Sequence, residues 1–225
     1  MNRVCLLMAL MLMLTAGRVQ AATGGLAPND TLPKPKFLSG IAVQGDFVGF
    51  GMKLAGGRFA NMEVGCRLNL MEKYFPIVEL GVGDCTHEGR ETSSIFSTTA
   101  PYFRIGADYC FTKKRNGNRL LAGLRYGYSS YKYDFQTEDL QDPIWPNTNT
   151  EAGQLTDMDG RNHWAEVVVG VETKLWRFIR LGWNMRYKMR IHQKASPKGE
   201  PWYVPGFGRN DGNCWGGTVN LIFEL

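Results

Sequence analysis

The feature that constrains this fold most is a strict alternation of apolar and polar residues over positions 179–192. Every second position there is apolar, namely Ile179, Leu181, Trp183, Met185, Tyr187, Met189 and Ile191. The positions between them carry mostly Arg and Lys. Because a period of two sends successive side chains to opposite faces of a β-strand, this segment predicts a strand with one apolar and one cationic face.

The same alternation recurs in seven further segments, and helical periodicity is nearly absent. These segments are Ile41–Gly49, Asn61–Leu70, Val78–Gly83, Phe103–Phe111, Leu120–Ser129, Glu166–Leu175 and Trp215–Leu225. The connections alternate between short ones at Met71–Lys73, Lys113–Asn118 and Trp176, and long ones at Asp84–Thr99, Asp134–Asn162 and Lys194–Asn213. This alternation is typical of outer-membrane barrels with short periplasmic turns. We therefore predict an all-β fold, an eight-stranded antiparallel transmembrane β-barrel, built as an up-and-down meander with both termini at the periplasmic end.

The chain begins with a segment typical of a secretory signal peptide. Arg3 precedes an apolar run over residues 4–14, and Ala21 ends a stretch with small residues at the positions that signal peptidase reads. The apolar run of 11 residues is too short to cross a bilayer as a helix. We predict a cleaved signal peptide over residues 1–21, a Pro- and Gly-rich periplasmic leader over 22–38 and the barrel over 39–225.

The charge balance does not point to a nucleic-acid partner. The sequence has 26 Lys and Arg against 21 Asp and Glu, and cleavage after Ala21 removes Arg3 and Arg18. The remaining surplus is small and evenly spread, whereas nucleic-acid-binding domains carry clustered basic residues. No apolar run of 18 residues follows the signal segment, so a helical membrane protein is not expected.

The distribution of glycine indicates which face of the strands lies inside. A soluble barrel or sandwich would place the apolar face inward, and an outer-membrane barrel would place it against lipid. The charged face also carries Gly65, Gly81, Gly83, Gly106, Gly123, Gly127, Gly170, Gly182 and Gly216. On a solvated face glycine only weakens a strand, whereas inside a narrow barrel it makes room for long neighbours. The polar face is therefore assigned to the interior, and the aromatic residues near the strand ends to two interfacial girdles.

The assigned interior carries almost equal numbers of positive and negative side chains. The cations are Arg67, Arg104, Arg125, Lys174, Arg180, Arg186, Lys188 and Arg190, and the anions are Asp46, Glu63, Glu79, Asp108, Glu166, Glu172 and Glu224. An eight-stranded barrel is just wide enough for its side chains to fill it, and an unpaired buried charge costs several kcal/mol. We predict a closed interior filled by salt bridges, and the alternative is a water-filled, anion-selective channel.

The sequence indicates no catalytic, cofactor or metal site. His87, His163 and His192 are expected near the outer ends of strands, which is the level at which a lipid-modifying enzyme would work. His163 and Glu166 are three apart, and on a strand that spacing places them on opposite faces. A nucleophile activated by histidine is not evident, and metal-ligating residues do not cluster.

Four cysteines, Cys66, Cys85, Cys110 and Cys214, remain after the signal segment. They are far apart and form no CxxC pair, so we interpret them mainly as small apolar residues. A bridge between Cys85 and Cys214 stays open as an alternative.

Aromatic residues in two long connections form a candidate contact surface. They are Trp145, Trp202, Tyr203 and Phe207, in segments made rigid by proline. Exposed rings in long loops often mark a binding surface. The alternative, equally open, is that the loops fold back as a lid over the barrel mouth.

Five segments together resemble an uncharacterised family of Bacteroidota outer-membrane barrel proteins, a domain-of-unknown-function family. They are Phe75–Gly81, Leu124–Ser129, His163–Val167, Gly182–Lys188 and Tyr203–Gly208. The architecture is also similar to eight-stranded barrels of the OmpA, OmpX and OmpW type, although the chain ends in Leu225 rather than in their usual aromatic residue. The resemblance implies a fold and an envelope location but no activity.

The functional hypothesis from sequence is a non-enzymatic protein of the bacterial outer membrane. It contacts outer-membrane lipid and serves as envelope structure or docks an envelope protein partner. The alternatives are a small pore or transporter for ions or apolar ligands, and a lipid-modifying enzyme.

Overall fold

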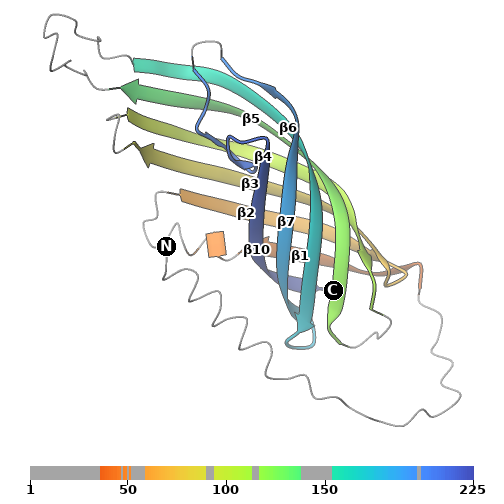
Figure 1. Cartoon of the computed structure of the whole chain (residues 1–225). Coiled ribbons are helices and arrows are strands. Elements are labelled where there is room, and N and C mark those ends of the chain that lie inside the picture. The colour runs from red at the N-terminus through yellow and green to blue at the C-terminus, as the bar shows by residue number, and fades with distance from the viewer. Residues whose placement is uncertain are drawn as a thin grey trace, which may run out of the picture. The chain divides into compact units, whose positions relative to one another are not determined.

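Eight long strands close into an antiparallel barrel in the order β1-β10-β7-β6-β5-β4-β3-β2 (Figure 1). The computed structural model describes residues 36–46, 48–49, 51, 59–89, 94–112, 117–137, 154–196 and 199–225. The barrel strands are β1 (Leu38–Asp46), β2 (Phe59–Leu70), β3 (Tyr74–Glu88), β4 (Ser94–Cys110), β5 (Arg119–Thr137), β6 (Gln154–Lys174), β7 (Ile179–Lys194) and β10 (Asn213–Glu224). The predicted all-β meander of eight antiparallel strands is confirmed. The predicted signal peptide, most of the predicted leader and Trp145 lie outside the described residues.

The short turns lie at one end of the barrel, together with the beginning of β1 and the end of β10. Ile41 and Leu225 exchange backbone hydrogen bonds of 3.2 and 2.8 Å at that end. In the turn after β2, Lys73 N–H donates to Leu70 O at 3.0 Å. Met71 and Glu72 have φ angles of 54° and 57°, the left-handed geometry of a type I′ turn. The turn that follows β6 is equally tight, because Ile179 N–H donates to Trp176 O.

The seam between β1 and β10 is the shortest in the barrel. β1 pairs with β10 over Ala42–Asp46, whereas β5 and β6 pair from Arg119 to Gln136. Within the described part of the chain, the outer half of β10, Asn213–Val219, pairs with β7 alone. Among the described residues, the paired strands that form the barrel wall therefore extend least far where β1 ends.

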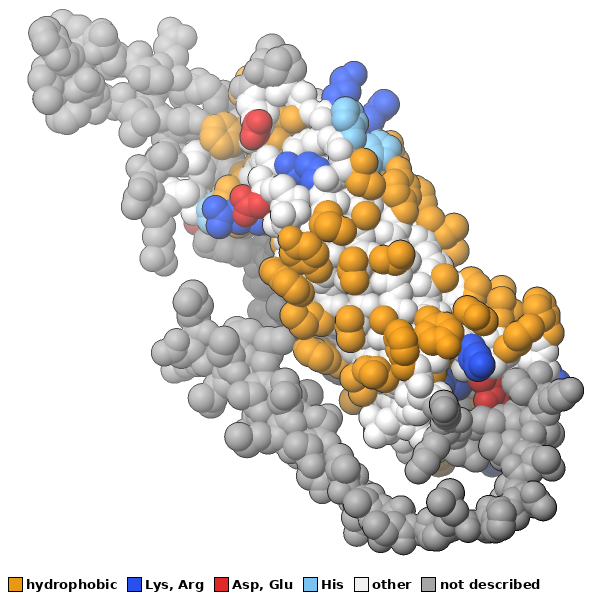
Figure 2. Space-filling model, turned by 45° about the vertical axis from the view of Figure 1, so that its right-hand side comes forward, with side chains coloured by type: hydrophobic (Ala, Val, Ile, Leu, Met, Phe, Trp, Pro, Cys, Tyr) orange, Lys and Arg blue, Asp and Glu red, His pale blue; other side chains and the backbone are white. Residues whose placement is uncertain are grey.

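Side-chain burial follows the face assignment made from the sequence. The alternate apolar residues point outward and stay exposed: Val64 is 60 % exposed, Leu80 63 %, Leu124 68 % and Val169 49 %. Figure 2 shows these hydrophobic side chains gathered in a broad band on the face of the barrel that is in view. The intervening charged residues are buried, with Glu79 and Glu166 at 0 % and Arg186 at 1 %. The described residues contain no helix with the length and hydropathy needed to cross a membrane.

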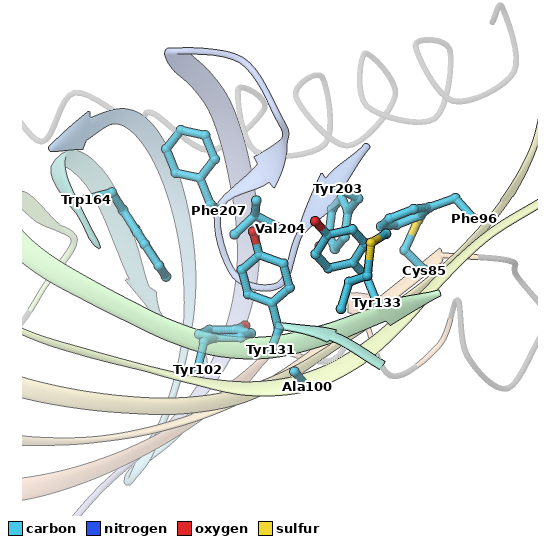
Figure 3. Close-up of a cluster of buried hydrophobic side chains, with 11 residues drawn as sticks. Cys85, Phe96, Ala100, Tyr102, Tyr131, Tyr133, Trp164, Tyr203, Val204 and Phe207 are labelled. Atoms are coloured by element: carbon cyan, nitrogen blue, oxygen red, sulfur yellow. The ribbon is translucent and has the colours of Figure 1, made fainter. Parts of the chain in front are cut away.

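The polarity of the two faces reverses in the outer parts of β3, β4, β5 and β6. Their inward side chains there are apolar or aromatic and form one buried cluster (Figure 3), which includes Cys85, Phe96, Tyr131, Tyr133 and Met158. Their outward side chains are polar, for example Thr99, Lys132 and Asp159, which are all exposed. These four strands thus continue beyond the hydrophobic band as a sheet with an ordinary apolar core side.

This reversal corrects two of the predicted long connections. β3 and β4 occupy most of Asp84–Thr99 and leave only residues 89–93 between them. β5 and β6 likewise extend into Asp134–Asn162, up to Thr137 and from Gln154. The prediction assumed that the apolar residues of every strand point outward. In these outer parts the apolar residues point inward, so the prediction did not recognise them as strands.

Candidate functional site

The middle of the barrel is filled by three carboxylates and three guanidinium groups from six strands. The carboxylates are Glu63, Glu79 and Glu166, and the guanidinium groups belong to Arg104, Arg125 and Arg186. None of these side chains is more than 4 % exposed. We call this set the central network.

Glu79 is the common partner within the central network. It lies 2.9 Å from Arg186 Nη1 through Oε2, 2.5 Å from Arg125 Nη1 through Oε1, and 3.3 Å from Arg104 Nη1. Arg186 also reaches Glu63 Oε1 at 3.0 Å, and Arg104 reaches Glu63 Oε2 at 2.7 Å. Arg104 and Arg186 also contact Glu166, at 3.3 and 3.5 Å. Each carboxylate is therefore shared by at least two arginines, and the pair of Glu79 with Arg186 crosses the barrel from β3 to β7.

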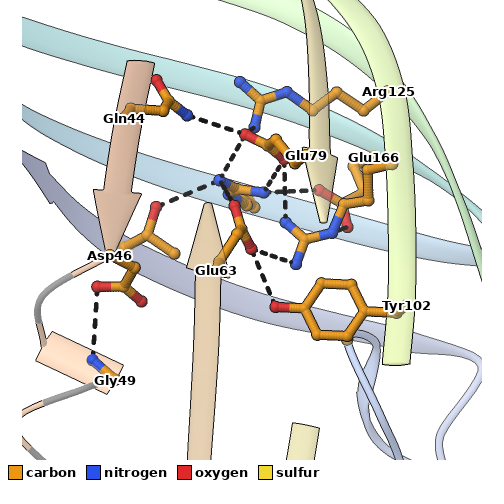
Figure 4. Close-up of polar contacts among 12 residues, drawn as sticks. Gln44, Asp46, Gly49, Glu63, Glu79, Tyr102, Arg125 and Glu166 are labelled. Carbon is orange, nitrogen blue, oxygen red and sulfur yellow. Dashed lines mark hydrogen bonds and ion pairs between the residues drawn. The ribbon is translucent and has the colours of Figure 1, made fainter. Parts of the chain in front are cut away.

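Neutral side chains complete the central network. Tyr102 Oη donates to Glu63 at 3.1 Å, Gln44 Nε2 to Glu79 at 3.1 Å and Trp164 Nε1 to Glu166 at 2.6 Å. Figure 4 shows Gln44, Arg125 and Tyr102 converging on these carboxylates. Gln44 lies on the polar face that the alternation assigned to the interior, together with Asp46. Tyr102 and Trp164 were not predicted there, although they occupy the same phase of alternation as Arg104 and Glu166.

A second network lies nearer the short turns. It joins three arginines to two carboxylates, and its members are Arg67, Arg119, Arg180, Glu172 and Glu224. Arg67 Nη2 donates to Glu172 at 2.9 Å, and Arg180 Nε to Glu224 at 2.6 Å. Arg119 was not among the predicted interior residues because it stands at the first position of its strand, but it is buried and lies 3.0 Å from Glu224. The Phe75 ring lies under Arg67 and Arg119, with centroid distances of 5.1 and 5.2 Å.

The positive and negative side chains of the two networks are equal in number. Asp108, which accepts from Arg125 at 3.0 Å, brings the described interior set to six carboxylates against six guanidinium groups. Removing one member of a buried ion pair leaves an uncompensated charge and is strongly destabilising, whereas a matched set is tolerated. The arrangement can therefore fill the barrel at zero net charge.

Four predicted members of the charge network take other places. Lys174 is exposed, and Asp46 accepts from the backbone amides of Val48 and Gly49. Lys188 is 7 % exposed and donates to two backbone carbonyl groups. Arg190 Nη2 donates to Asn210 Oδ1 at 2.6 Å and its guanidinium lies over the Phe207 ring. Alternation alone placed these residues on a face, but it did not determine their partners.

The segment 199–212 folds back into the barrel mouth, and we call it the lid. It contains the two-residue strands β8 (Tyr203–Val204) and β9 (Gly208–Arg209), which pair with each other. Phe207 N–H donates to Val204 O across Pro205 and Gly206, and the φ of +78° at Gly206 is that of a type II turn. A Cβ at Gly206 would also lie 2.4 Å from the Tyr102 ring, so this position requires glycine.

The lid buries two of the rings that the sequence offered as a contact surface. Tyr203 is 2 % exposed and Phe207 0 %, and Figure 3 shows them with Trp164, Tyr131 and Tyr133 in one cluster. Tyr203 and Phe207 therefore do not form an exposed contact surface. Of the two alternatives for this loop, the structure shows the one in which it folds back over the barrel mouth. Trp202 is 41 % exposed, and its ring stacks on His87 at a centroid distance of 3.9 Å.

Hydrogen bonds from the barrel hold the lid. Lys188 Nζ donates to Gly206 O at 2.7 Å and to Phe207 O at 3.0 Å. Tyr133 Oη donates to Gly199 O at 2.5 Å, and Tyr203 Oη donates to Asn61 Oδ1 at 3.0 Å. Burial raises the pKa of the Tyr203 phenol, so it stays a neutral donor. Burial also raises the pKa of Tyr131 to about 12.

A cavity of about 350 Å³ lies beside the contact between Tyr102 and Gly206, and it is lined by both the lid and the central network. Glu63, Tyr102 and Arg186 line it from the central network, and Phe207 lines it from the lid. Its side wall is the outer half of β10 together with the end of β1 at Asp46. The cavity therefore lies where the barrel wall is lowest.

The sequence matches one known family, described as "Domain of unknown function (DUF6048)", over residues 1–222. The chain belongs to the DUF6048 family. No curated protein and no solved structure matches it. The domain-of-unknown-function part of the sequence resemblance is thereby confirmed, and the barrel described above is the structure of a DUF6048 protein. The Bacteroidota origin and the kinship to OmpA-type barrels stay predictions.

The glycines inside this DUF6048 barrel make room for rings as well as for charges. A Cβ at Gly127 would lie 2.2 Å from the Trp164 ring, and one at Gly106 would lie 2.7 Å from the Arg125 side chain. The sequence pattern predicted only the second kind of contact, because the interior face was expected to be purely polar.

The remaining chemistry-bearing residues of the DUF6048 chain are dispersed. Cys66, Cys85, Cys110 and Cys214 are free thiols, so the alternative of a Cys85–Cys214 bridge is not what the structure shows. Burial, with a smaller contribution from Asp84, raises the pKa of Cys85 to about 11. Within the described residues no three His, Cys, Asp or Glu side chains are grouped as a metal site.

Proposed function

We propose that this DUF6048 chain is a non-enzymatic β-barrel of the bacterial outer membrane, with a closed interior and a structural or partner-docking role in the envelope. One observation carries the proposal: a closed ring of strands has an exposed apolar band outside and buried, charge-matched side chains inside. A soluble barrel places these two faces the other way round.

Aromatic pairs at both edges of the band support the membrane placement. Tyr74 and Tyr109 lie 5.5 Å apart toward the short turns, and Tyr187 and Trp215 lie 4.7 Å apart toward the lid. Tyr and Trp are enriched at the two membrane–water interfaces. The reversal of polarity in β3–β6 lies just beyond the second edge, as expected for strands that leave the bilayer.

The docking role follows from the parts of the protein outside the band. The extended strands β3–β6 and the exposed Trp202 form a surface beyond the bilayer, where an envelope partner could bind without entering the barrel. Affinity capture of the tagged protein under mild detergent should recover a defined envelope partner. Recovery of the protein alone, as a monomer, would refute the docking role but would be compatible with the structural role.

A spin label tests the membrane placement. Cys66 is the exposed cysteine, on the outward face of β2 between Val43 and Val78 in the strand register. In the reconstituted protein, a nitroxide on Cys66 should collide with dissolved oxygen and be shielded from a water-soluble nickel complex. The matched control is C66S/S130C, which moves the label to an outward position beyond the polarity reversal and should show the opposite accessibility. Free access of the nickel complex to Cys66 would refute the membrane placement.

The cavity under the lid favours a second candidate, a small pore or a carrier of amphipathic ligands. It has room for a small ligand, and one side of it is the low wall between β1 and β10. Planar-bilayer recordings distinguish the two functions. The central network predicts an absence of stable channels, whereas stable unitary currents that Lys188→Met increases would favour the pore.

A further inference from the structure

The strongest unassigned surface feature is a group of four basic or histidine side chains on the outer face of β6 and β7. Arg161 stands directly opposite Lys194, and His163 stands directly opposite His192. Arg161, Lys194 and His192 are exposed, and His163 is partly exposed. We call these four residues the rim cluster; Figure 2 shows Lys, Arg and His side chains gathered beyond one end of the hydrophobic band.

Without a bound anion, the rim cluster destabilises the pairing of β6 with β7. Like charges directly opposite each other on neighbouring strands destabilise the pairing. Within the described part of the chain, neither Arg161 nor Lys194 has a carboxylate within salt-bridge distance. The described residues therefore supply no carboxylate that offsets the repulsion between these two cations.

The next outward-facing positions show the ordinary arrangement. On the neighbouring strand pair, Lys132 stands opposite Asp159, and Lys132 Nζ lies 3.2 Å from Asp157 Oδ1. One step farther out on the same sheet, a cation is thus accompanied by two carboxylates. The positive excess is confined to the level of Arg161 and Lys194.

That level coincides with the edge of the hydrophobic band. Below the rim cluster, the outward positions of β6 are Ala165, Val167 and Val169, and the two valines are 39 % and 49 % exposed. Tyr126 Oη lies 2.6 Å from His163 Nδ1, and the Tyr128 ring centroid lies 4.7 Å from that of His163. The two tyrosines fix the imidazole at the place where the lipid face ends.

We propose that the rim cluster binds the phosphate group of a membrane lipid in the leaflet at the lid end of the barrel. The inference rests on the proposed membrane placement. Paired cross-strand positions lie close enough for both cations to donate to one phosphate, and an acyl chain can then lie along the apolar face below. A phosphate at this point removes the repulsion between Arg161 and Lys194 and stabilises the sheet.

The test uses the full mature chain in neutral detergent micelles, with phosphatidic acid as the phosphate lipid and phosphatidylcholine as the reference. Native mass spectrometry should show one phosphatidic acid retained in preference to phosphatidylcholine. Each exposed cation near an anionic lipid surface contributes about fivefold to binding, so R161Q/K194Q should weaken phosphatidic acid binding by about thirtyfold. The matched control is Lys174→Gln, an exposed cation at the other end of β6, which should leave binding unchanged.

Three results would overturn the rim site while the membrane placement stands. They are unchanged lipid binding by R161Q/K194Q, an equal loss with Lys174→Gln, and complete displacement of the lipid by inorganic phosphate at the same concentration. The last result would identify free phosphate as the ligand. Failure of the membrane placement is recognised separately, because the nitroxide on Cys66 would then be accessible to the nickel complex.

Discussion

Replacing Arg186 tests whether the interior is held by charge balance. Its guanidinium group contacts Glu79 at 2.9 Å, Glu63 at 3.0 Å and Glu166 at 3.5 Å, and all four side chains are at most 4 % exposed. In Arg186→Met, three buried carboxylates would share two remaining arginines, Arg104 and Arg125. Leaving one buried charge uncompensated costs about 3 to 5 kcal/mol, and we expect this loss in the free energy of unfolding.

A second substitution separates charge balance from the loss of packing. Glu79→Gln alone should cost a similar amount, because it leaves one arginine in excess. The double variant R186M/E79Q restores neutrality, so its cost should be close to that of one single substitution rather than to their sum. Urea unfolding of the reconstituted protein, followed by tryptophan fluorescence and by the mobility difference between folded and unfolded protein in gels, gives all three values. Strict additivity, or a loss below about 1 kcal/mol for Arg186→Met, would refute the reasoning, because exposed pairs already reach that value.

Three further perturbations address the outer face, the lid and the outer sheet. Val169→Lys should lower the free energy of unfolding by about 2 to 4 kcal/mol in lipid, since it places a cation on the lipid face, and a neutral effect would contradict the membrane placement. Lys188→Met leaves two lid carbonyl groups without their donor, so trypsin should cleave after Arg209 faster while the barrel stays folded; unchanged cleavage would show that Lys188 does not hold the lid. Burial raises the pKa of Tyr131 from 10.0 to about 12, so the neutral phenol contributes stability below pH 10 that is lost as the pH rises toward 12. The phenolate absorbance that Tyr131→Phe removes should therefore change together with lid proteolysis in that range, and formation of the Tyr131 phenolate at the ordinary pKa would contradict its burial.

Alternation, with the lengths of the connections and the placement of glycine, was sufficient to predict the eight-stranded ring and its faces, because each strand repeats one phase along the hydrophobic band. Val169 and Arg186 lie on the faces that their positions predicted. The outer parts of β5 and β6 were not predicted as strands because the alternation reverses there. Tyr131 and Tyr133 point inward, at positions where the prediction expected polar residues. When only the outward positions are compared with the expected apolar pattern, these segments look like polar loops.

The partners of the interior charges could not be predicted in the same way. Glu79 and Arg186 are 107 residues apart and meet because their strands face each other across the barrel. Alternation gives the face of a residue but neither its level nor the residue opposite. Lys188 is an example: it was assigned to the same charged face as Arg186, but it lies nearer the lid and donates to lid carbonyl groups instead of to a carboxylate.

The short seam between β1 and β10 has a consequence for how the barrel forms. The long strand pairs β3–β4 and β5–β6 connect neighbours in sequence and can form early as a curved, open sheet. The cross-barrel bonds of Glu79 and Arg186 cannot form until that sheet curls. Pairs between neighbouring strands, such as Glu79–Arg104, can form in the open sheet, whereas the cross-barrel pairs form only as the seam at Ala42–Asp46 closes.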